Sequence, residues 1–328
     1  MQNNTCVMVL GAPRSGTSAI TRLLPILGIG LGDDMVPPNP NNPRGFFEDT
    51  AVQWINTRLL ETAGRHIEWP GFDRKKAESA RDFSRLRQEA GALLRQRLAN
   101  MDLWAFKDPR ATRLVWFWQS LFSQNSCRDV YIYALRDPAK VATSLCASSG
   151  LRPLAGLALW LECTVSAIQD TLERPGVVIS YENLLTNPRR QLQRIAHAFH
   201  WESRVLEKEM QFYENKFIDP SLEHATRVSQ DLIQAPILLP LAFDVYNLLL
   251  GRAMDDAIST DFTAAWNRLY SRYRTEFPAF LAVHPWMQDE KAIFAPRTQR
   301  LYQRLQYHGA GELTRLGRRF ADKLIRGG

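Results

Sequence analysis

A loop with the composition of a phosphate-binding site lies near the start of the chain. The segment Gly11-Ala12-Pro13-Arg14-Ser15-Gly16-Thr17-Ser18 follows an apolar run, Thr5 to Leu10, and overlaps the start of an amphipathic pattern, Thr17 to Leu27. This order predicts a strand, a glycine-containing loop and a helix. Backbone N–H groups in such a loop bind an anion, and the helix dipole favours its negative charge. The alternative is a glycine turn without a ligand.

The loop lacks the lysine of a nucleoside-triphosphate site. Thr17 stands where that lysine follows the second glycine, and the cation of the loop is Arg14. Because the missing lysine contacts the β and γ phosphates, its absence argues against ordinary ATP or GTP chemistry. A different nucleotide phosphate fits the loop better.

The same residues resemble the loop of sulfotransferases that use 3′-phosphoadenosine 5′-phosphosulfate (PAPS). That family carries P-[KR]-[ST]-G-[ST]-[ST] between its first strand and helix, and this chain has Pro13-Arg14-Ser15-Gly16-Thr17-Ser18. Other branches of the family share arginine at the position of Arg14, where many members have lysine. The resemblance implies that PAPS is bound by Arg14, Ser15, Gly16, Thr17 and Ser18.

A second part of the resemblance is a strand followed by R-[DN]-P and a serine eight residues after the arginine. Here Val130 to Leu135 precede Arg136-Asp137-Pro138, and Ser144 stands at that offset. The resemblance implies that Arg136 and Ser144 bind the 3′-phosphate of PAPS. An arginine at a strand end and a hydroxyl two turns along the next helix can converge on one phosphate. Taken alone, Arg136 is equally a surface ion-pair partner and Ser144 an ordinary helical serine.

A third part of the resemblance is Tyr181-Glu182-Asn183-Leu184-Leu185, which follows an apolar run and precedes a helical pattern starting near Pro188. Related enzymes have Y-E-[DN]-L at this place, which implies that Tyr181 lies near the adenine. A core residue at a strand end is the alternative. The three signatures cover roughly residues 5 to 200.

Sulfonate transfer needs cations at the developing charge and a base for the acceptor. Besides Arg14, the cation is Lys107, which ends the apolar run from Leu103 and resembles the lysine of the cytosolic branch. That branch has its catalytic histidine two residues later, where this chain has Pro109. A histidine base of that type is therefore not expected.

The base that we prefer is Glu48. It lies in Gly45-Phe46-Phe47-Glu48-Asp49 and resembles a glutamate that carbohydrate and tyrosyl branches use shortly after the first helix. Alternatively, Glu48 caps the helix expected from Thr50. Asp108 is the second candidate base, and Arg110 contacts PAPS or an acidic acceptor unless Asp108 and Arg110 form a structural ion pair.

These residues need a sheet that brings strand ends together. Strands are expected at Thr5 to Leu10, Leu103 to Lys107, Val130 to Leu135 and Val177 to Ser180, alternating with helical patterns that include Thr50 to Ala63 and Ala77 to Asn100. This predicts an α/β fold, a P-loop-like three-layer sandwich with a central parallel sheet. Residues 1–215 form the PAPS-binding core, and residues 216–328 form a mostly helical C-terminal extension or cap.

Composition agrees with a large buried core. The chain has 328 residues, of which 45% are hydrophobic and 23% charged, and its net charge of +7 does not choose among anionic partners. Its four cysteines stand singly and its six histidines lack metal-ligand spacing, so we expect reduced thiols, a cytoplasmic location and no metal. The apolar segment Leu232 to Leu250 contains Pro236, Pro240 and Asp244, and we interpret it as buried helix.

The end of the chain is basic. Arginine and lysine far exceed Glu312 and Asp322 after residue 296. A solvated helix is one interpretation, and peripheral contact with a membrane or a polyanion is the other. No nucleic-acid partner is expected.

The expected function is transfer of a sulfonate group from PAPS to a hydroxyl or amine of an acceptor, by analogy a saccharide, a glycolipid or another small metabolite. One alternative is a kinase-like phosphotransferase, in which Leu135 to Asp137 would be the acidic end of a strand. The missing loop lysine argues against it. The other alternative is a non-catalytic nucleotide-binding or glycan-binding protein. The presence of Arg14, Lys107 and Glu48 together argues against a loss of catalysis.

Overall fold

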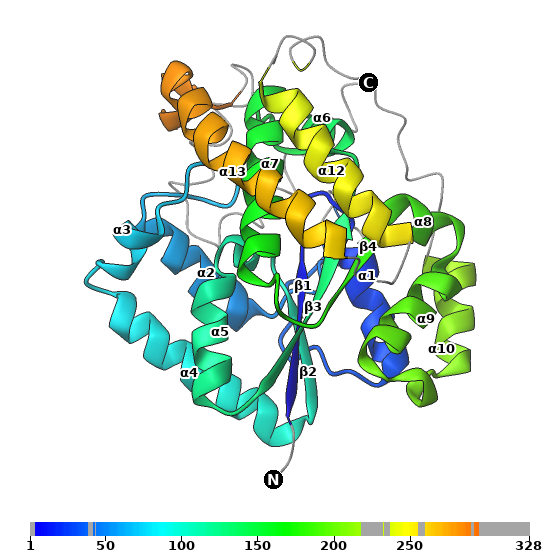
Figure 1. Cartoon of the computed structure of the whole chain (residues 1–328). Coiled ribbons are helices and arrows are strands. Elements are labelled where there is room, and N and C mark those ends of the chain that lie inside the picture. The colour runs from blue at the N-terminus through cyan, green and yellow to red at the C-terminus, as the bar shows by residue number, and fades with distance from the viewer. Residues whose placement is uncertain are drawn as a thin grey trace, which may run out of the picture.

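A parallel sheet forms the centre of the protein (Figure 1). The computed structural model describes residues 4–38, 42, 44–217, 232, 237–254, 260–289 and 292–294. Within these residues the sheet has four strands in the order β2-β1-β3-β4, and every neighbouring pair is parallel. The strands are β1 Thr5–Leu10, β2 Leu103–Lys107, β3 Arg128–Leu135 and β4 Gly176–Ser180.

Both faces of the sheet are buried. Successive side chains of a strand point to opposite faces, and in β1 Met8 belongs to one hydrophobic cluster while Val7 and Val9 belong to another. The first cluster includes apolar residues of α2 (Thr50–Thr62), α4 (Phe83–Asn100), α5 (Val115–Gln124), α6 (Pro138–Ser149) and α7 (Pro153–Asp170). The second includes those of α1 (Thr17–Leu23) and α9 (Pro188–Phe199). The predicted three-layer α/β sandwich is therefore confirmed.

The helices alternate with the strands along most of the described chain. They are α1 Thr17–Leu23, α2 Thr50–Thr62, α3 Arg74–Glu78, α4 Phe83–Asn100, α5 Val115–Gln124, α6 Pro138–Ser149, α7 Pro153–Asp170, α8 Tyr181–Thr186, α9 Pro188–Phe199, α10 Glu207–Phe212, α12 Leu238–Met254 and α13 Thr260–Val283. Short 3-10 turns lie at Leu24–Leu27, Pro109–Arg113, Glu202–Arg204 and Pro285–Gln288.

The order of the strands fixes where a ligand can bind. The helix after β1, α1, packs on one face of the sheet, whereas the helix after β3, α6, packs on the other. Such a switch point opens a crevice at the carboxyl ends of two neighbouring strands. The loop after β1 and Arg136 after β3 both lie at these ends.

Two helices differ from their prediction, because the structure shows each as two shorter elements. The pattern from Thr17 to Leu27 becomes α1 followed by a 3-10 turn, because Pro25 cannot donate the backbone hydrogen bond of a continuing α-helix. The single helix expected from Ala77 to Asn100 is α3 and α4, with a turn at residues 79–82. After this turn the ring of Phe83 lies against Trp116, with ring centroids 6.0 Å apart.

Most of the described residues after 217 are helical, and they pack on the core. Helix α12 contacts β4 and α7, and Trp266 of α13 donates a hydrogen bond from Nε1 to Gln169 of α7. Helix α12 contains Leu238 to Leu250 of the segment that was interpreted as buried helix, and it continues to Met254. The domain division at residue 215 stays a prediction, and the basic end of the chain lies outside the described residues.

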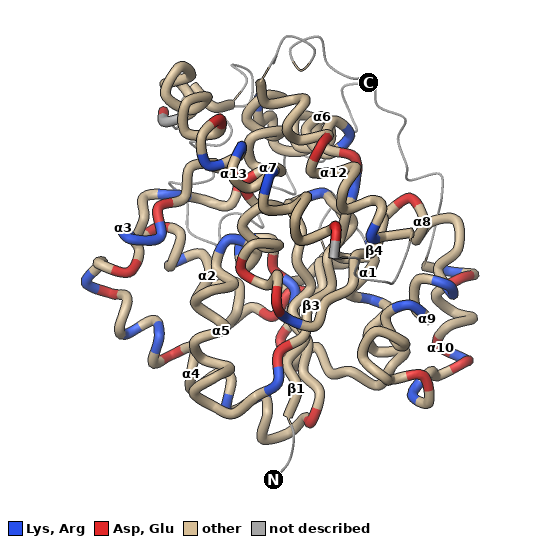
Figure 2. Tube along the Cα trace, viewed as in Figure 1, with Lys and Arg blue, Asp and Glu red and all other residues tan. Residues whose placement is uncertain are grey.

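Charged residues are frequent on the outer helices, and several others, among them Lys107, Asp108 and Arg136, are buried. Figure 2 shows Lys and Arg interspersed with Asp and Glu along α3, α4 and α10, while β1 is free of charge. In β2 the charged residue is Lys107, at the carboxyl end of the strand. A buried lysine at that position needs a partner, and its partner belongs to the candidate site.

Candidate active site

The loop between β1 and α1 has a special backbone. Gly16 has φ 87°, and Arg14, which is not glycine, has φ 70°. A left-handed arginine is uncommon and points to a functional constraint. Thr112 fixes the start of the loop, because its Oγ1 lies 3.1 Å from both the N and the O of Gly11.

Residues from three distant segments meet at this loop. Arg14 Nε donates to Ser144 Oγ at 3.1 Å, and Arg136 donates to the backbone O of Arg14 at 2.9 Å. The guanidinium of Arg136 lies 4.7 Å from the centre of the Tyr181 ring. The structure thus brings together Arg14, Arg136, Ser144 and Tyr181.

Tyr181 also explains why the second loop glycine is required. A Cβ added at Gly16 would lie 2.2 Å from Cδ2 of Tyr181, much closer than real side chains approach. The tyrosine ring therefore packs directly on the backbone of the phosphate loop. Tyr181 directly follows β4 and is half-buried, and its contact with the adenine stays a prediction.

The sequence Arg136-Asp137-Pro138 has a simple local explanation. Asp137 is the N-cap of α6 and accepts hydrogen bonds from the backbone N of Ala139 and Lys140 at 2.8 and 3.0 Å. Pro138 occupies the first turn, where no N–H is needed. Asp137 is thus engaged with the helix, and the hydrogen bond shown for the Arg136 guanidinium goes to the loop.

Two polar atoms at this place lack partners. Among the described residues, Ser15 Oγ and Arg136 Nε are buried and make no hydrogen bond. Burial lowers the pKa of Arg14, and the nearby charge of Arg136 lowers it further. Two close arginines and two unpaired polar atoms fit an anionic ligand, since buried polar groups are normally hydrogen-bonded.

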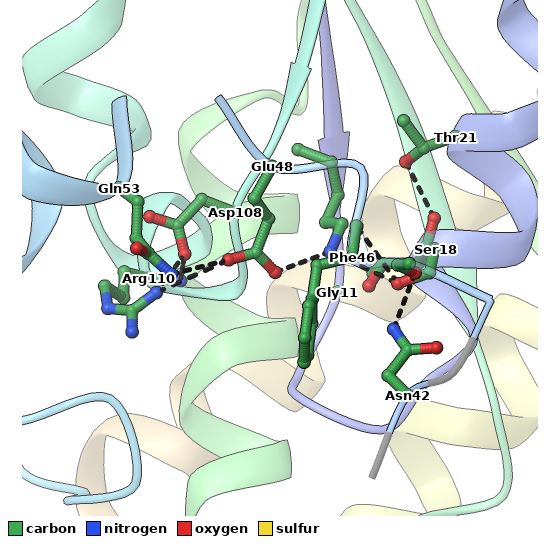
Figure 3. A network of polar contacts seen from close by, with 12 residues as sticks. Gly11, Ser18, Thr21, Asn42, Phe46, Glu48, Gln53, Asp108 and Arg110 are labelled. Carbon is green, nitrogen blue, oxygen red and sulfur yellow. Dashed lines mark hydrogen bonds and ion pairs between the residues drawn. The ribbon is translucent and has the colours of Figure 1, made fainter. Parts of the chain in front are cut away.

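A second cluster adjoins the loop and is drawn in Figure 3. Lys107 Nζ lies 2.6 Å from Glu48 Oε1 and 3.3 Å from Ser18 Oγ. Ser18 in turn donates to the backbone O of Phe46 at 3.2 Å. These contacts join the end of β2, the start of α1 and the segment before α2.

Glu48 is not the cap of the following helix. The N-cap of α2 is Asp49, whose Oδ1 accepts from the backbone N of Ala51 at 3.0 Å. Asp49 is also buried against Arg97, whose NH2 lies 2.7 Å from Asp49 Oδ2. The capping interpretation of Glu48 is therefore wrong, and its carboxylate faces Lys107 instead.

Asp108 is buried and its oxygens are engaged. Oδ1 accepts from the backbone N and the NH1 of Arg110 at 3.0 and 2.9 Å, and Oδ2 accepts from Asn56 Nδ2 at 2.9 Å. Burial alone lowers the pKa of Arg110, but the carboxylates of Asp108 and Glu48 raise it above its usual value. Asp108 and Arg110 thus form the structural ion pair that was one of the two expectations.

Sequence reasoning missed two amides of α2. Gln53 Nε2 donates to Glu48 Oε2 at 3.1 Å, and Asn56 donates to Asp108. The two residues are three positions apart and therefore share a face of the helix. Two amide residues three positions apart, in the helix that follows a candidate catalytic glutamate, were the sequence feature that could have predicted these contacts.

The described residues hold no group of three or more His, Cys, Asp or Glu side chains that suits a metal ion. No helix in this part of the chain is long and apolar enough to span a membrane.

No protein-family model and no curated protein matches the chain. Among solved structures, it is similar to the sulfotransferase domain of the olefin synthase of Synechococcus PCC 7002, with 14% identity, 84% of this chain and 96% of that chain covered, and a TM-score of 0.40. It is also similar to a sulfotransferase domain of the curacin biosynthetic pathway, with 17% identity, 60% and 74% coverage and a TM-score of 0.34.

Proposed function

We propose that the protein transfers a sulfonate group from PAPS to a hydroxyl or amine of an acceptor. The observation that carries this proposal is the meeting of Arg14, Arg136 and Ser144 at the loop after β1, directly beside the Lys107–Glu48 pair. Groups that can bind an anion therefore lie next to a carboxylate that can remove a proton. Sulfonate transfer requires both.

The nucleotide is assigned to the loop and its neighbours. Ser15, Gly16, Thr17 and Ser18 face the 5′ end of PAPS, while Arg136 and Ser144 bind its 3′-phosphate. The unpaired Ser15 Oγ and Arg136 Nε support this assignment, because each has a hydrogen bond still to make. Tyr181, whose ring lies against the guanidinium of Arg136, is assigned to the adenine.

PAPS supplies the sulfonate group and a phosphate that leaves with its electron pair. Arg14 and Lys107 stabilise the charge on the transferred group and on that leaving oxygen. Glu48 removes the proton of the acceptor, which lets the acceptor oxygen or nitrogen attack. Ser18 touches Lys107 and thereby links the nucleotide loop to the cation of the transfer site.

Asp108 is not proposed as the base. Each of its oxygens already accepts a hydrogen bond from Arg110 or Asn56, and the residue is fully buried. A proton acceptor must lie within hydrogen-bond reach of the acceptor group. Glu48 is also buried, but its Oε1 contacts Lys107, which in turn contacts Ser18 of the nucleotide loop, so we propose Glu48 as the base.

For the acceptor we propose a saccharide, a glycolipid or another small metabolite. The segment beside Glu48 offers Phe46 and Phe47, and the Phe47 ring contacts Phe217 edge to face, with centroids 5.9 Å apart. An apolar portion of an acceptor can pack on such rings. We further propose that the reaction uses no metal and takes place in the cytoplasm.

The test is a screen of candidate acceptors with radiolabelled PAPS in the presence of EDTA. Label should appear in a sulfated product and not require a divalent ion. Transfer from γ-labelled ATP that depends on added magnesium would instead support a phosphotransferase. Tight nucleotide binding without transfer to any acceptor would support a binding protein.

A further inference from the structure

Helix α2 places two side-chain amides against two carboxylates. Gln53 Nε2 donates to Glu48 Oε2 at 3.1 Å, and one turn later Asn56 Nδ2 donates to Asp108 Oδ2 at 2.9 Å. Residues three positions apart lie on one face of a helix. A single helix therefore sets the position of both candidate bases.

The two amides differ in how they are held. Asn56 is fully buried, and Trp118 Nε1 donates to its Oδ1 at 2.9 Å. Gln53 is only partly buried, and the hydrogen bond shown for its side chain goes to Glu48. The Asn56–Asp108 contact is thus part of the core, whereas the Gln53–Glu48 contact lies at the edge of the site.

The contacts of Glu48 are divided between its two oxygens. Oε2 accepts from Gln53, and Arg110 NH1 lies 3.7 Å from the same atom. Oε1 lies 2.6 Å from Lys107 Nζ. Of these partners, Lys107 also touches the nucleotide loop through Ser18, so it is the one that PAPS can draw away.

We propose that Gln53 is a positioning residue that holds Glu48 Oε2 and so reserves Oε1 for the proton of the acceptor. This rests on the sulfonate-transfer function proposed above. Lys107 turns from Oε1 to the bound sulfonate, and Oε1 takes the acceptor proton. The acceptor atom then forms a bond to sulfur, and the bond between sulfur and the phosphate oxygen breaks. Its electron pair leaves with 3′-phosphoadenosine 5′-phosphate.

Two substitutions separate this role from a structural one. Gln53→Met keeps the length of the side chain but removes the donor, and it should lower kcat about tenfold, the scale of a misplaced catalytic group. Gln53→Glu puts a second carboxylate beside Glu48, and it should raise the pH at which kcat falls on the acid side by about one unit. Arg58→Gln, on the exposed side of α2, is the matched control.

The charged groups around Glu48 set the pH response. Lys107 and Arg110 face it as cations, and Asp108 lies behind Arg110 as an anion. On its own segment, the neighbouring Asp49 is paired with Arg97. Since none of these groups changes in the Gln53 variants, a shifted pH profile reports the contact between residues 53 and 48.

Infrared spectroscopy on protein with isotope-labelled glutamate measures the protonation and hydrogen bonding of the Glu48 carboxyl group, and it requires no catalytic turnover. Each spectrum is taken as a difference against the same variant carrying Glu48→Gln. We expect Gln53→Met to shift the carboxylate band of Glu48, and Gln53→Glu to raise the pH at which its protonated band grows by about one unit. An unmoved Glu48 signal in both variants would overturn the positioning role. A moved signal, with no label transferred from PAPS by the wild type, would leave the contact standing and reject sulfonate transfer.

Discussion

Lys107 Nζ lies 2.6 Å from Glu48 Oε1, and both side chains are buried. The lysine ends β2, and the glutamate precedes α2, so the fold joins two segments that are distant in sequence. Removing one member of a buried pair leaves the other charge uncompensated. In the proposed reaction, bound PAPS replaces Glu48 as the partner of Lys107, and the carboxylate of Glu48 is released to act as the base.

Glu48→Gln should lower kcat by about two orders of magnitude, the usual scale for losing a general base. Affinity for 3′-phosphoadenosine 5′-phosphate should remain nearly unchanged, because the base acts on the acceptor. The measurement is steady-state kinetics on an acceptor found in the screen, together with calorimetry of nucleotide binding. Near-normal turnover in Glu48→Gln would show that another group removes the proton.

Asp108→Asn is the matched comparison for that experiment. Because Asp108 is buried and paired with Arg110, its neutralisation should lower the free energy of unfolding by about 3 kcal/mol. Glu48→Gln should lower it by a similar amount, because it leaves the buried Lys107 without its carboxylate partner. Urea denaturation checks both variants, and an unchanged free energy of unfolding in either one would contradict the importance of its buried ion pair.

Gly16→Ala should weaken binding of 3′-phosphoadenosine 5′-phosphate by about tenfold or more, equal to about 1.4 kcal/mol. The added Cβ would lie 2.2 Å from Tyr181 Cδ2, so the tyrosine and the loop must separate. Gly28→Ala is the control, because Gly28 also has a positive φ but nothing lies within 4 Å of its added Cβ. Calorimetry on both variants tests this, and equal affinities would mean that the Tyr181 contact does not support the nucleotide site.

The meeting of the loop, Arg136 and Tyr181 could be predicted from the sequence. Each follows a strongly apolar run, and the carboxyl ends of parallel strands meet at one edge of a sheet. The resemblance to a known motif then assigned Ser144 to the same place. Their roles in binding PAPS stay predictions.

The neighbourhood of Glu48 could not be predicted in the same way. Glu48 and Asp49 are adjacent carboxylates before a helix, and either can cap it on sequence grounds. The contact that distinguishes the two carboxylates comes from Arg97, which lies 48 positions after Asp49 in the sequence and donates a hydrogen bond to it. The engagement of Asp108 depends likewise on Asn56, whose orientation requires the rotation of α2 relative to β2.

Arg136→Ala should weaken binding of 3′-phosphoadenosine 5′-phosphate by about 2 kcal/mol, or about thirtyfold, the scale of a lost charge-assisted contact. Arg128→Ala removes an exposed arginine from the opposite end of the same strand and should leave the affinity unchanged. Calorimetry on the two folded variants compares them directly. An unchanged dissociation constant in Arg136→Ala would leave Arg136 with a purely structural contact to the loop.

Stability should depend on pH through Asp170. Burial raises the pKa of Asp170 to about 6 from its ordinary value of 3.8. Between these values the folded state binds more protons than the unfolded state, so stability falls as the pH rises, by at most about 3 kcal/mol. Asp170→Asn removes this loss and should exceed the wild type in free energy of unfolding at pH 7, but not at pH 4. Urea denaturation of both proteins at pH 4 and pH 7 measures this. The same difference in free energy of unfolding between Asp170→Asn and the wild type at both pH values would contradict the raised pKa of Asp170.

Calorimetric titration of the wild-type protein with 3′-phosphoadenosine 5′-phosphate and with AMP tests the central claim most directly. The two ligands differ only in the 3′-phosphate, which is assigned to Arg136 and Ser144. Two charge-assisted contacts should make 3′-phosphoadenosine 5′-phosphate bind at least about a hundredfold more tightly than AMP. Equal affinity for the two nucleotides would contradict the assignment of this site to PAPS.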